Sequence, residues 1–421
     1  MANEPVVLAV MLAVFTAAVF VWKLPSGLAL VLSAAAGALT AGEGLPVRHL
    51  VEGSFGYLDA VLIIATAMVL MKVVEAGGAL GTISYGLMKW LYRWPSLLMI
   101  FVAFFVMFPG MLTGLSSACI LTTGALVAPA LQALGIPAAS VGSLIAFLAV
   151  LGMVAPPINI PVMIIGGGVD MPYVGFDKPL LLATFPIAIL TALYYRYRYV
   201  RTIVLEQVLS KLPPSLYVRH GMKLFLPLGL VVALMLSIRL FPQWVPDIGI
   251  PLIFMLGAVA GIFTGERFRF WPVARQGIRE ALPVMGILVG VGMFVQIMTL
   301  TGVRGFLAVG ALQLPPALLC LGIALLMPAF GSAYAASSVL GVPLVYVFLG
   351  KNEIVIASAL SLIAGIGDLM PPPMLLCSFA AQIVGEKNPW RILKECLPMI
   401  LVSLLVGIAM ILLADKVARL Y

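Results

Sequence analysis

Long apolar segments separated by short polar connections dominate the sequence. Segments such as Val6–Trp22, Ala60–Met71 and Met399–Leu413 are apolar on every side. This length and pattern are typical of membrane-spanning helices, because a helix satisfies its own backbone hydrogen bonds in lipid. Membrane β-barrels instead show weak alternation over segments of about ten residues. The pattern therefore predicts an all-α polytopic membrane protein.

Composition and charge exclude several other classes. Of the 421 residues, 63% are apolar and only 10% are charged, whereas soluble domains have about 25% charged residues. A soluble enzyme is therefore excluded, and we expect no enzymatic activity. The net charge of +8 fits basic loops on one membrane face rather than nucleic-acid binding. The four cysteines lie in apolar segments without metal-ligand spacing, which indicates buried free thiols.

Short motifs recur in two halves of the chain. Residues 114–118 (Gly-Leu-Ser-Ser-Ala) correspond to residues 329–333 (Ala-Phe-Gly-Ser-Ala), 215 positions later. The same separation relates Gly152 and its following double proline to Gly367 and Pro371-Pro372. The least apolar stretch, residues 196–223, lies between the two sets. We therefore predict a duplication, with one repeat over residues 1–210 and the other over residues 211–421.

Apolar segments interrupted by glycine and proline occur at corresponding places in both repeats. They predict a re-entrant helical hairpin at about 94–134 and a broken helix at about 138–170 in the first repeat. Their counterparts are a hairpin at about 306–350 and a broken helix at about 354–385. Paired broken segments of this kind indicate the binding site of a secondary transporter.

The distribution of basic residues predicts the orientation. With the elements above, sixteen of the 24 lysines and arginines fall on the side that holds residues 196–223. That side is expected to be cytoplasmic. Both termini then lie outside, and the two repeats have inverted topology. We expect a multi-pass protein of a bacterial or archaeal cytoplasmic (inner) membrane, in contact with its lipids.

The breaks supply groups that suit a cation and an anion. Proline lacks an N–H and disfavours helix at the preceding residue, so each double proline leaves carbonyl groups free. Free carbonyls at helix ends suit Na⁺, and helix N-termini suit a carboxylate. Additional oxygen atoms come from Thr113, Ser116, Ser117, Asn159, Ser332, Ser337 and Ser338. The alternative is that these side chains bond back to their own helices.

Asp368 is the one acidic residue within the apolar stretch Ile354–Phe379. A carboxylate is costly inside a membrane and is a functional candidate by default. It could bind Na⁺, carry a proton, or serve only as a helix cap or ion-pair partner. Lys72 and Glu75, near the end of another apolar segment, are expected to reach the membrane interface.

The two break motifs resemble those of the large membrane subunit of TRAP (tripartite ATP-independent periplasmic) transporters. The resemblance lies in residues 114–118 followed by residues 152–157, and in their second-half counterparts. Residues Ile158-Asn159 follow the first double proline where the family usually has serine, which indicates a divergent or stand-alone member. The resemblance implies an elevator mechanism, and it implies a small membrane subunit and a periplasmic substrate-binding protein as partners.

Together these features predict the site residues. The resemblance implies that the hairpin tips and the loops before the double prolines bind the cation, with Na⁺ as the bound metal. This cation-binding set is Ser116, Ser117, Gly152, Ala155, Gly331, Ser332, Gly367, Asp368 and Met370. The substrate-binding set is Thr113, Gly114, Pro157, Asn159, Ser337 and Pro372. The predicted function is Na⁺-coupled uptake of a small organic anion, such as a C4-dicarboxylate or sugar acid, with no cofactor besides the coupling ion. The alternatives are a proton-coupled carrier or cation/proton antiporter using Asp368, and a non-transporting membrane scaffold.

Overall fold

The computed structural model describes residues 4–200, 203–241, 243–244, 246–371 and 373–420. These residues form helices and connections and contain no strand. Six of the helices are long and apolar enough to cross a membrane, and the pair Val47–Phe55 and Leu58–Ala76, bent by 43°, adds a seventh candidate. The chain is thus an all-α polytopic membrane protein, as its hydrophobic pattern predicts.

The first half contains two scaffold helices, a bent pair, a short helix, a hairpin, a broken helix and a closing helix. In order these are α1 (Glu4–Phe20), α2 (Ser26–Ala41), α3 (Val47–Phe55), α4 (Leu58–Ala76), α5 (Ala79–Leu91), α6 (Pro95–Thr113), α7 (Ser116–Cys119), η1 (Ile120–Gly124), α8 (Ala125–Ala133), α9 (Ala138–Val154), α10 (Ile160–Gly168) and α11 (Asp177–Tyr199). Three short segments, α12 (Leu205–Leu209), α13 (Tyr217–His220) and η2 (Gly221–Phe225), lead to the second half.

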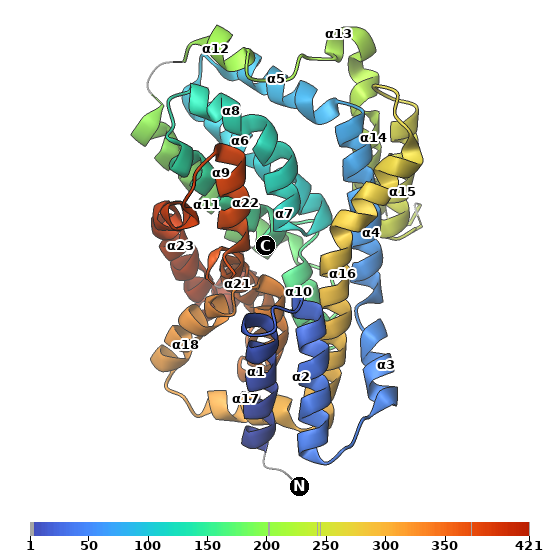
Figure 1. Ribbon diagram of the computed structural model, residues 1–421, viewed down its shortest axis with the longest axis vertical. Coiled ribbons are helices and arrows are strands. Elements are labelled where there is room, and N and C mark those ends of the chain that lie inside the picture. Colours follow the sequence, from blue (N-terminus) through green and yellow to red (C-terminus); the bar gives the residue numbers. More distant parts are fainter. Residues whose placement is uncertain (1–3, 201–202, 242, 245, 372, 421) are drawn as a thin grey trace.

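The second half follows the same order. Its elements are α14 (Leu226–Leu240), α15 (Ile250–Ile262), α16 (Phe270–Leu300), α17 (Val303–Leu312), α18 (Pro316–Ala329), α19 (Ala333–Ala336), η3 (Ser337–Gly341), α20 (Val342–Val347), α21 (Glu353–Gly365), η4 (Ile366–Leu369), α22 (Leu375–Val384), α23 (Pro389–Leu412) and α24 (Ala414–Ala418). In Figure 1, α4 leads to α5 at one end of the molecule and α16 leads to α17 at the opposite end. The two series therefore run in opposite directions.

Two corrections to the predicted elements concern the second hairpin. It begins at Pro316 rather than near residue 306, because α17 is a separate helix and Pro315-Pro316 starts a new one. The hairpin turns also correspond at a separation of 217 residues rather than 215. The reason is that each turn needs a residue with positive φ, and these residues are Gly114 (φ 68°) and Gly331 (φ 63°). The breaks at Ala155 and Met370, both extended, do keep the predicted separation of 215.

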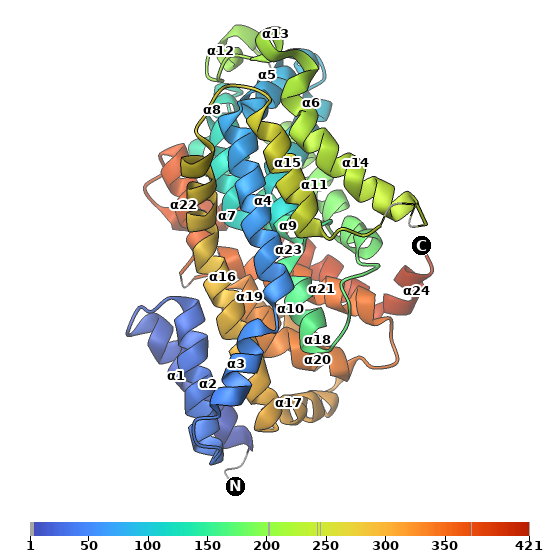
Figure 2. The same ribbon diagram turned by 90° about the vertical axis from the view of Figure 1, so that its right-hand side faces the viewer.

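The helices form two groups. A scaffold group, α1–α4 with α14–α16, packs through contacts of α16 with α2, α3 and α4. A hairpin group contains α6–α11 and α18–α23, and α9 contacts α6, α11, α22 and α23 within it. The groups lie side by side in Figure 1, and Figure 2 shows α4 and α16 on the scaffold face. Helices α5 and α17 connect the groups.

Glycines permit the close approach of the scaffold helices. A Cβ atom added to Gly290 would lie 2.3 Å from the carbonyl oxygen of Gly27, and one at Gly292 would lie 2.0 Å from that of Gly53. Small residues at such crossings are typical of membrane helices, where tight van der Waals packing drives association. The glycines of α16 therefore allow its backbone to contact those of α2 and α3 directly.

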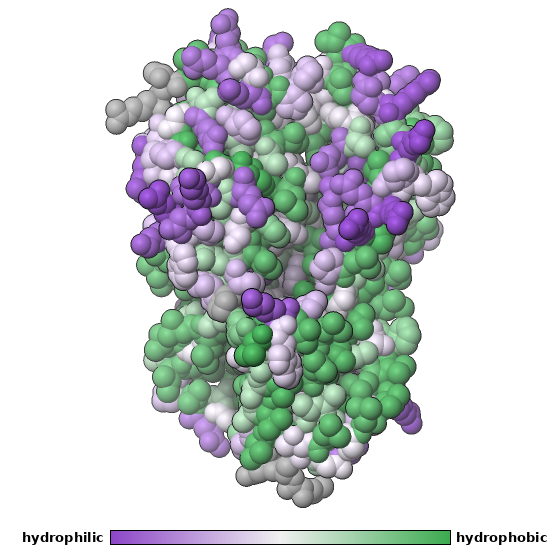
Figure 3. Space-filling model, in the orientation of Figure 1, coloured by the Kyte–Doolittle hydropathy of each residue, from purple (hydrophilic) through white to green (hydrophobic). Residues whose placement is uncertain are grey.

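The surface is polar mainly at one end. Figure 3 shows hydrophilic residues over the end that carries α5, α12 and α13, and hydrophobic residues over most of the opposite half. The polar end holds the basic connection between the two halves. This arrangement agrees with the charge asymmetry of the sequence. The predicted location of both termini outside stays a prediction.

Candidate functional site at the two hairpin tips

The tip of the first hairpin is a tight turn between α6 and α7. Thr113 donates a hydrogen bond from Oγ1 to the carbonyl of Pro109 (2.7 Å) and accepts one from the N–H of Leu115 (3.2 Å). Gly114 has no space for a side chain, since an added Cβ would lie 2.3 Å from Cγ1 of Ile160. Ser116 then begins α7 with its hydroxyl at the helix N-terminus.

The second tip has the same form with different side chains. Gly331 takes the left-handed conformation and Ser332 is extended, so that Ser332 caps α19. The Ser332 hydroxyl accepts a hydrogen bond from the N–H of Ala335 (3.4 Å). In both hairpins a short helix leads into a π-helical turn, η1 or η3, and then into the returning helix.

The first broken helix is closed by Asn159. Its side-chain oxygen accepts a hydrogen bond from the N–H of Val162 (2.9 Å) at the start of α10. Its side-chain nitrogen donates to the carbonyl of Val154 (2.8 Å), at the end of α9, and to the hydroxyl of Ser361 (3.0 Å) on α21. Asn159 is fully buried. It therefore joins the two broken helices and has no free amide group for a substrate.

Asp368 connects the two hairpin tips. It lies in η4, at the break of the second broken helix. Its Oδ2 accepts a hydrogen bond from the hydroxyl of Ser116 (2.8 Å) and its Oδ1 accepts one from the N–H of Ala333 (2.8 Å). Ser116 and Ala333 each stand at the start of a hairpin helix. The carboxylate thus occupies the position that the partial positive charge at both helix N-termini favours for an anion.

A second contact joins the tips directly. The hydroxyl of Tyr334, one residue after Ala333, donates a hydrogen bond to the carbonyl of Gly114 (3.1 Å). Gly367 packs against the other tip, where an added Cβ would lie 3.3 Å from the backbone nitrogen of Ser332. The tips and the second break therefore form one connected unit from three distant segments.

A cavity of about 280 Å³ opens beside this unit. Its walls include five of the predicted residues, namely Ser116, Ser117, Gly331, Ser332 and Asp368. The opposite wall comes from the scaffold group, where Phe15 of α1 and Glu280 of α16 contribute. The two charged residues in the lining are both acidic. The cavity therefore lies between the hairpin and scaffold groups and offers oxygen atoms on both sides.

Glu280 is held in place by a buried lysine. Lys72 of α4 pairs with Glu280 (3.0 Å) and with Glu75 (3.1 Å), and its side chain is only 9% exposed. Gln276 donates a further hydrogen bond to Glu280 (3.0 Å). The expectation that Lys72 reaches the membrane interface is therefore wrong. A buried lysine needs paired charges, and these come from Glu75 and from a helix far away in the sequence.

Several predicted residues lie away from the cavity. Thr113 and Ser337 donate to carbonyls of their own helices, Ser337 to that of Ala333 (2.8 Å). Gly152 packs against α6, where an added Cβ would lie 2.6 Å from the carbonyl oxygen of Met107. Gly114, Ala155, Pro157, Asn159, Gly367 and Met370 lie in the hairpin turn or in the breaks and do not line the cavity. Pro372 lies outside the described residues.

Sequence reasoning missed Tyr334 and Glu280 as neighbours of the site. Tyr334 directly follows the tip motif and is the only aromatic residue within α19. That signal could have indicated a contact across the tips. Nothing local indicated Glu280, whose place on the cavity wall depends on how α16 packs beside the hairpins.

The fold and site define a polytopic helical membrane protein in which two hairpin tips and the second helix break meet beside a mainly apolar cavity that carries two carboxylates. Among solved structures, the chain is similar to the YdaH transporter of Alcanivorax borkumensis, a structure described as having an unusual topology. The TM-score is 0.58, the sequence identity is 18%, and the match covers 87% of each chain. At this identity the similarity shows that the two chains share a fold.

The sequence comparisons add no family. No family model matches the chain, and no curated protein matches it by sequence. The resemblance to the TRAP membrane subunit therefore stays a prediction.

Proposed function

We propose that this chain is a secondary active transporter that couples a cation to the uptake of a small organic carboxylate, with Na⁺ as the cation. The observation that carries the proposal is the position of Asp368, which joins both hairpin tips at the edge of a cavity. The transporter fold of a solved structure supports it. The hairpin group would carry the site past the scaffold group in an elevator motion.

The contacts of Asp368 suggest how the two solutes are coupled. In the structure its carboxylate accepts the Ser116 hydroxyl and the Ala333 N–H. A cation that binds Asp368 would neutralise this charge and weaken its hold on both donors. The freed donors, at two helix N-termini, could then bind a substrate carboxylate. Each solute would raise the affinity for the other, as thermodynamic linkage requires.

The first test is the thermal stability of the purified protein, titrated with Na⁺ or K⁺ at constant ionic strength and at two pH values. A ligand that binds only the folded state raises the free energy of unfolding, by about 2.7 kcal/mol at a hundred times its Kd, and the thermal midpoint rises with it. We expect a rise with Na⁺ and little with K⁺. The Asp368→Asn variant should lose the rise while staying folded.

Proton coupling is the second candidate, because a single buried carboxylate with two neutral donors can also exchange a proton. Uptake into proteoliposomes separates the candidates. A Na⁺ gradient should drive uptake of labelled carboxylates at constant pH if Na⁺ is coupled, whereas a pH gradient alone should drive it if the proton is. Absence of any ion response or uptake would favour the non-transporting scaffold. Uptake by the chain alone would also show that the partner proteins are not required.

A further inference from the structure

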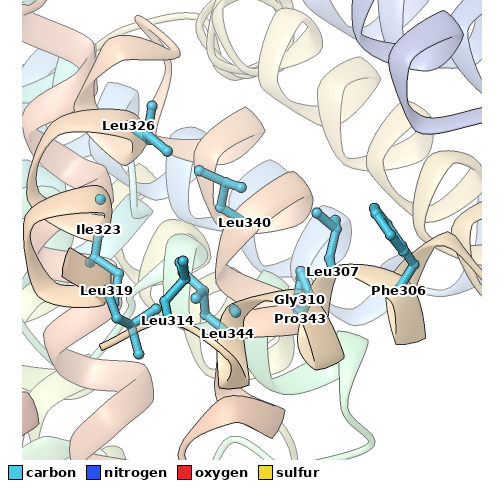
Figure 4. A pocket seen from close by; sticks show the side chains of 12 residues that line it. Phe306, Leu307, Gly310, Leu314, Leu319, Ile323, Leu326, Leu340, Pro343 and Leu344 are labelled. Carbon is cyan, nitrogen blue, oxygen red and sulfur yellow. The ribbon is translucent and has the colours of Figure 1, made fainter. Parts of the chain in front are cut away.

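A second hollow, unrelated to the Asp368 cavity, lies between α17 and the second hairpin. It has a volume of about 240 Å³. Figure 4 shows side chains of α17, α18 and the segment η3–α20 around one space, among them Leu307, Ile323, Leu326, Leu340 and Leu344. Every described residue that lines this groove is apolar. A polar ligand would find no hydrogen-bond partner there.

Two glycines in the lining of the groove leave unoccupied space beside them. A Cβ atom added to Gly310 on α17 or to Gly322 on α18 would meet no other atom within 4 Å. The adjoining surface of α18 carries Leu318, Leu321 and Leu325, which are at least half exposed. The groove is therefore continuous with a leucine-rich surface of a membrane-spanning protein.

The first half shows what fills the corresponding place. There α12 contacts both α5 and α8, the counterparts of α17 and α20. Val208 of α12 is 1% exposed, and Leu216 beyond it donates its N–H to Thr82 of α5 (3.1 Å). The connection thus packs against the first-half counterparts of two of the groove's walls. No described segment covers the groove of the second half.

We propose that the groove between α17, α18 and α20 binds one acyl chain of a membrane lipid. Its apolar lining, the exposed leucines beside it and the buried Val208 of the segment that packs at the corresponding place in the first half all fit a flexible alkyl chain. A bound chain packs against the same hairpin whose tip contacts Asp368. The lipid therefore contacts an element that would move in the elevator motion proposed above.

Photolabelling tests the proposal on the reconstituted full chain. The protein is placed in phosphatidylcholine and phosphatidylglycerol vesicles that contain a small fraction of phosphatidylcholine with a diazirine acyl chain. After irradiation, labelled peptides are mapped by mass spectrometry. We expect labelling of α17 and of η3–α20 to exceed that of the exposed lipid-facing surface of α14.

The double variant Gly310→Leu/Gly322→Leu fills the groove, and leucine is favoured over glycine in a helix. It should abolish the excess labelling. Gly229→Leu, at an equally open position on α14, is the matched control and should leave the excess unchanged. Equal labelling of the groove and α14 in the wild type would overturn the proposal. So would unlabelled groove peptides together with a change of oligomeric state in the double variant, which would identify a protein interface.

Discussion

At the scale of single residues, Asp368 has a short list of partners whose removal has distinct consequences. Ser116→Ala removes one of its two donors. A hydrogen bond to a charged group contributes about 1.5–3 kcal/mol, so the affinity for the coupling cation should change by roughly ten- to a hundredfold. Na⁺ titrations of stability and uptake measure this change. Ser117→Ala, in the same cavity wall, should have a smaller effect because no bond from its hydroxyl to Asp368 is seen.

Asn159 should matter for stability rather than for affinity. Asn159→Ala leaves the Val154 carbonyl and the Val162 N–H without their partner, and an unsatisfied buried polar group costs about 1–3 kcal/mol. We expect a lower thermal midpoint with an unchanged response to Na⁺. Asn159→Ser, whose hydroxyl can still accept from Val162 as a helix cap, should lose less. A loss of the Na⁺ response at unchanged stability would instead show that Asn159 takes part in binding.

The sequence singled out Asp368 and placed Ser116 in the same predicted set, but it did not predict the contact between them or the one with Ala333. Asp368 stood out because a lone acid in an apolar stretch is costly in a membrane. Its donors Ser116 and Ala333 come from two hairpins, and Ser116 is 252 positions away. Contacts at such separation depend on packing, which no local pattern encodes. The same reason explains the wrong expectation for Lys72, whose partner Glu280 lies on a distant helix.

At the scale of elements, the turns between helices depend on glycines for two separable reasons. Gly114 has both a positive φ and a neighbour that an added Cβ would approach to 2.3 Å, while Gly135 has a positive φ of 88° and open space. Left-handed backbone costs an alanine about 1–2 kcal/mol. Gly135→Ala should therefore lower the thermal midpoint modestly, and Gly114→Ala should lower it more. A similar decrease of the thermal midpoint in the two variants would show that the Ile160 side chain moves aside without loss of stability.

Element order was predictable, but the register of the hairpins was not. Glycine and proline mark each turn and break, and these marks suffice to place two hairpins and two broken helices. The π-helical turns η1 and η3 have no such mark, and the alignment of residues 114–118 with residues 329–333 placed the hairpins two residues out of register. The turn follows the residue that tolerates positive φ, Gly331, rather than the similarity of hydroxyl side chains.

At the scale of the whole molecule, two cavities lie along the boundary between the groups. One, of about 280 Å³, is lined by Asp368 and by the middle of α16, including Val284 and Ile287. The other, of about 490 Å³, is lined by the beginning of α4, including Ala60 and Ile63, which lie 224 positions earlier. Because α4 and α16 run in opposite directions, the two cavities occupy related places in the two halves. A site that moves between them would face first one end of the molecule and then the other.

The elevator proposal requires the hairpin group to slide past the scaffold, and one contact allows this to be tested. Phe15 of α1 lies against Phe330 at the second tip, with ring centroids 6.5 Å apart. A disulfide between cysteines at these positions should stop transport, and reduction should restore it, as measured by uptake into proteoliposomes. Phe104 and Phe185, 4.8 Å apart, both belong to the hairpin group. A cross-link between these two should leave uptake intact, because they move together. Full uptake with the Phe15–Phe330 positions cross-linked would rule out relative motion of the two groups at this contact.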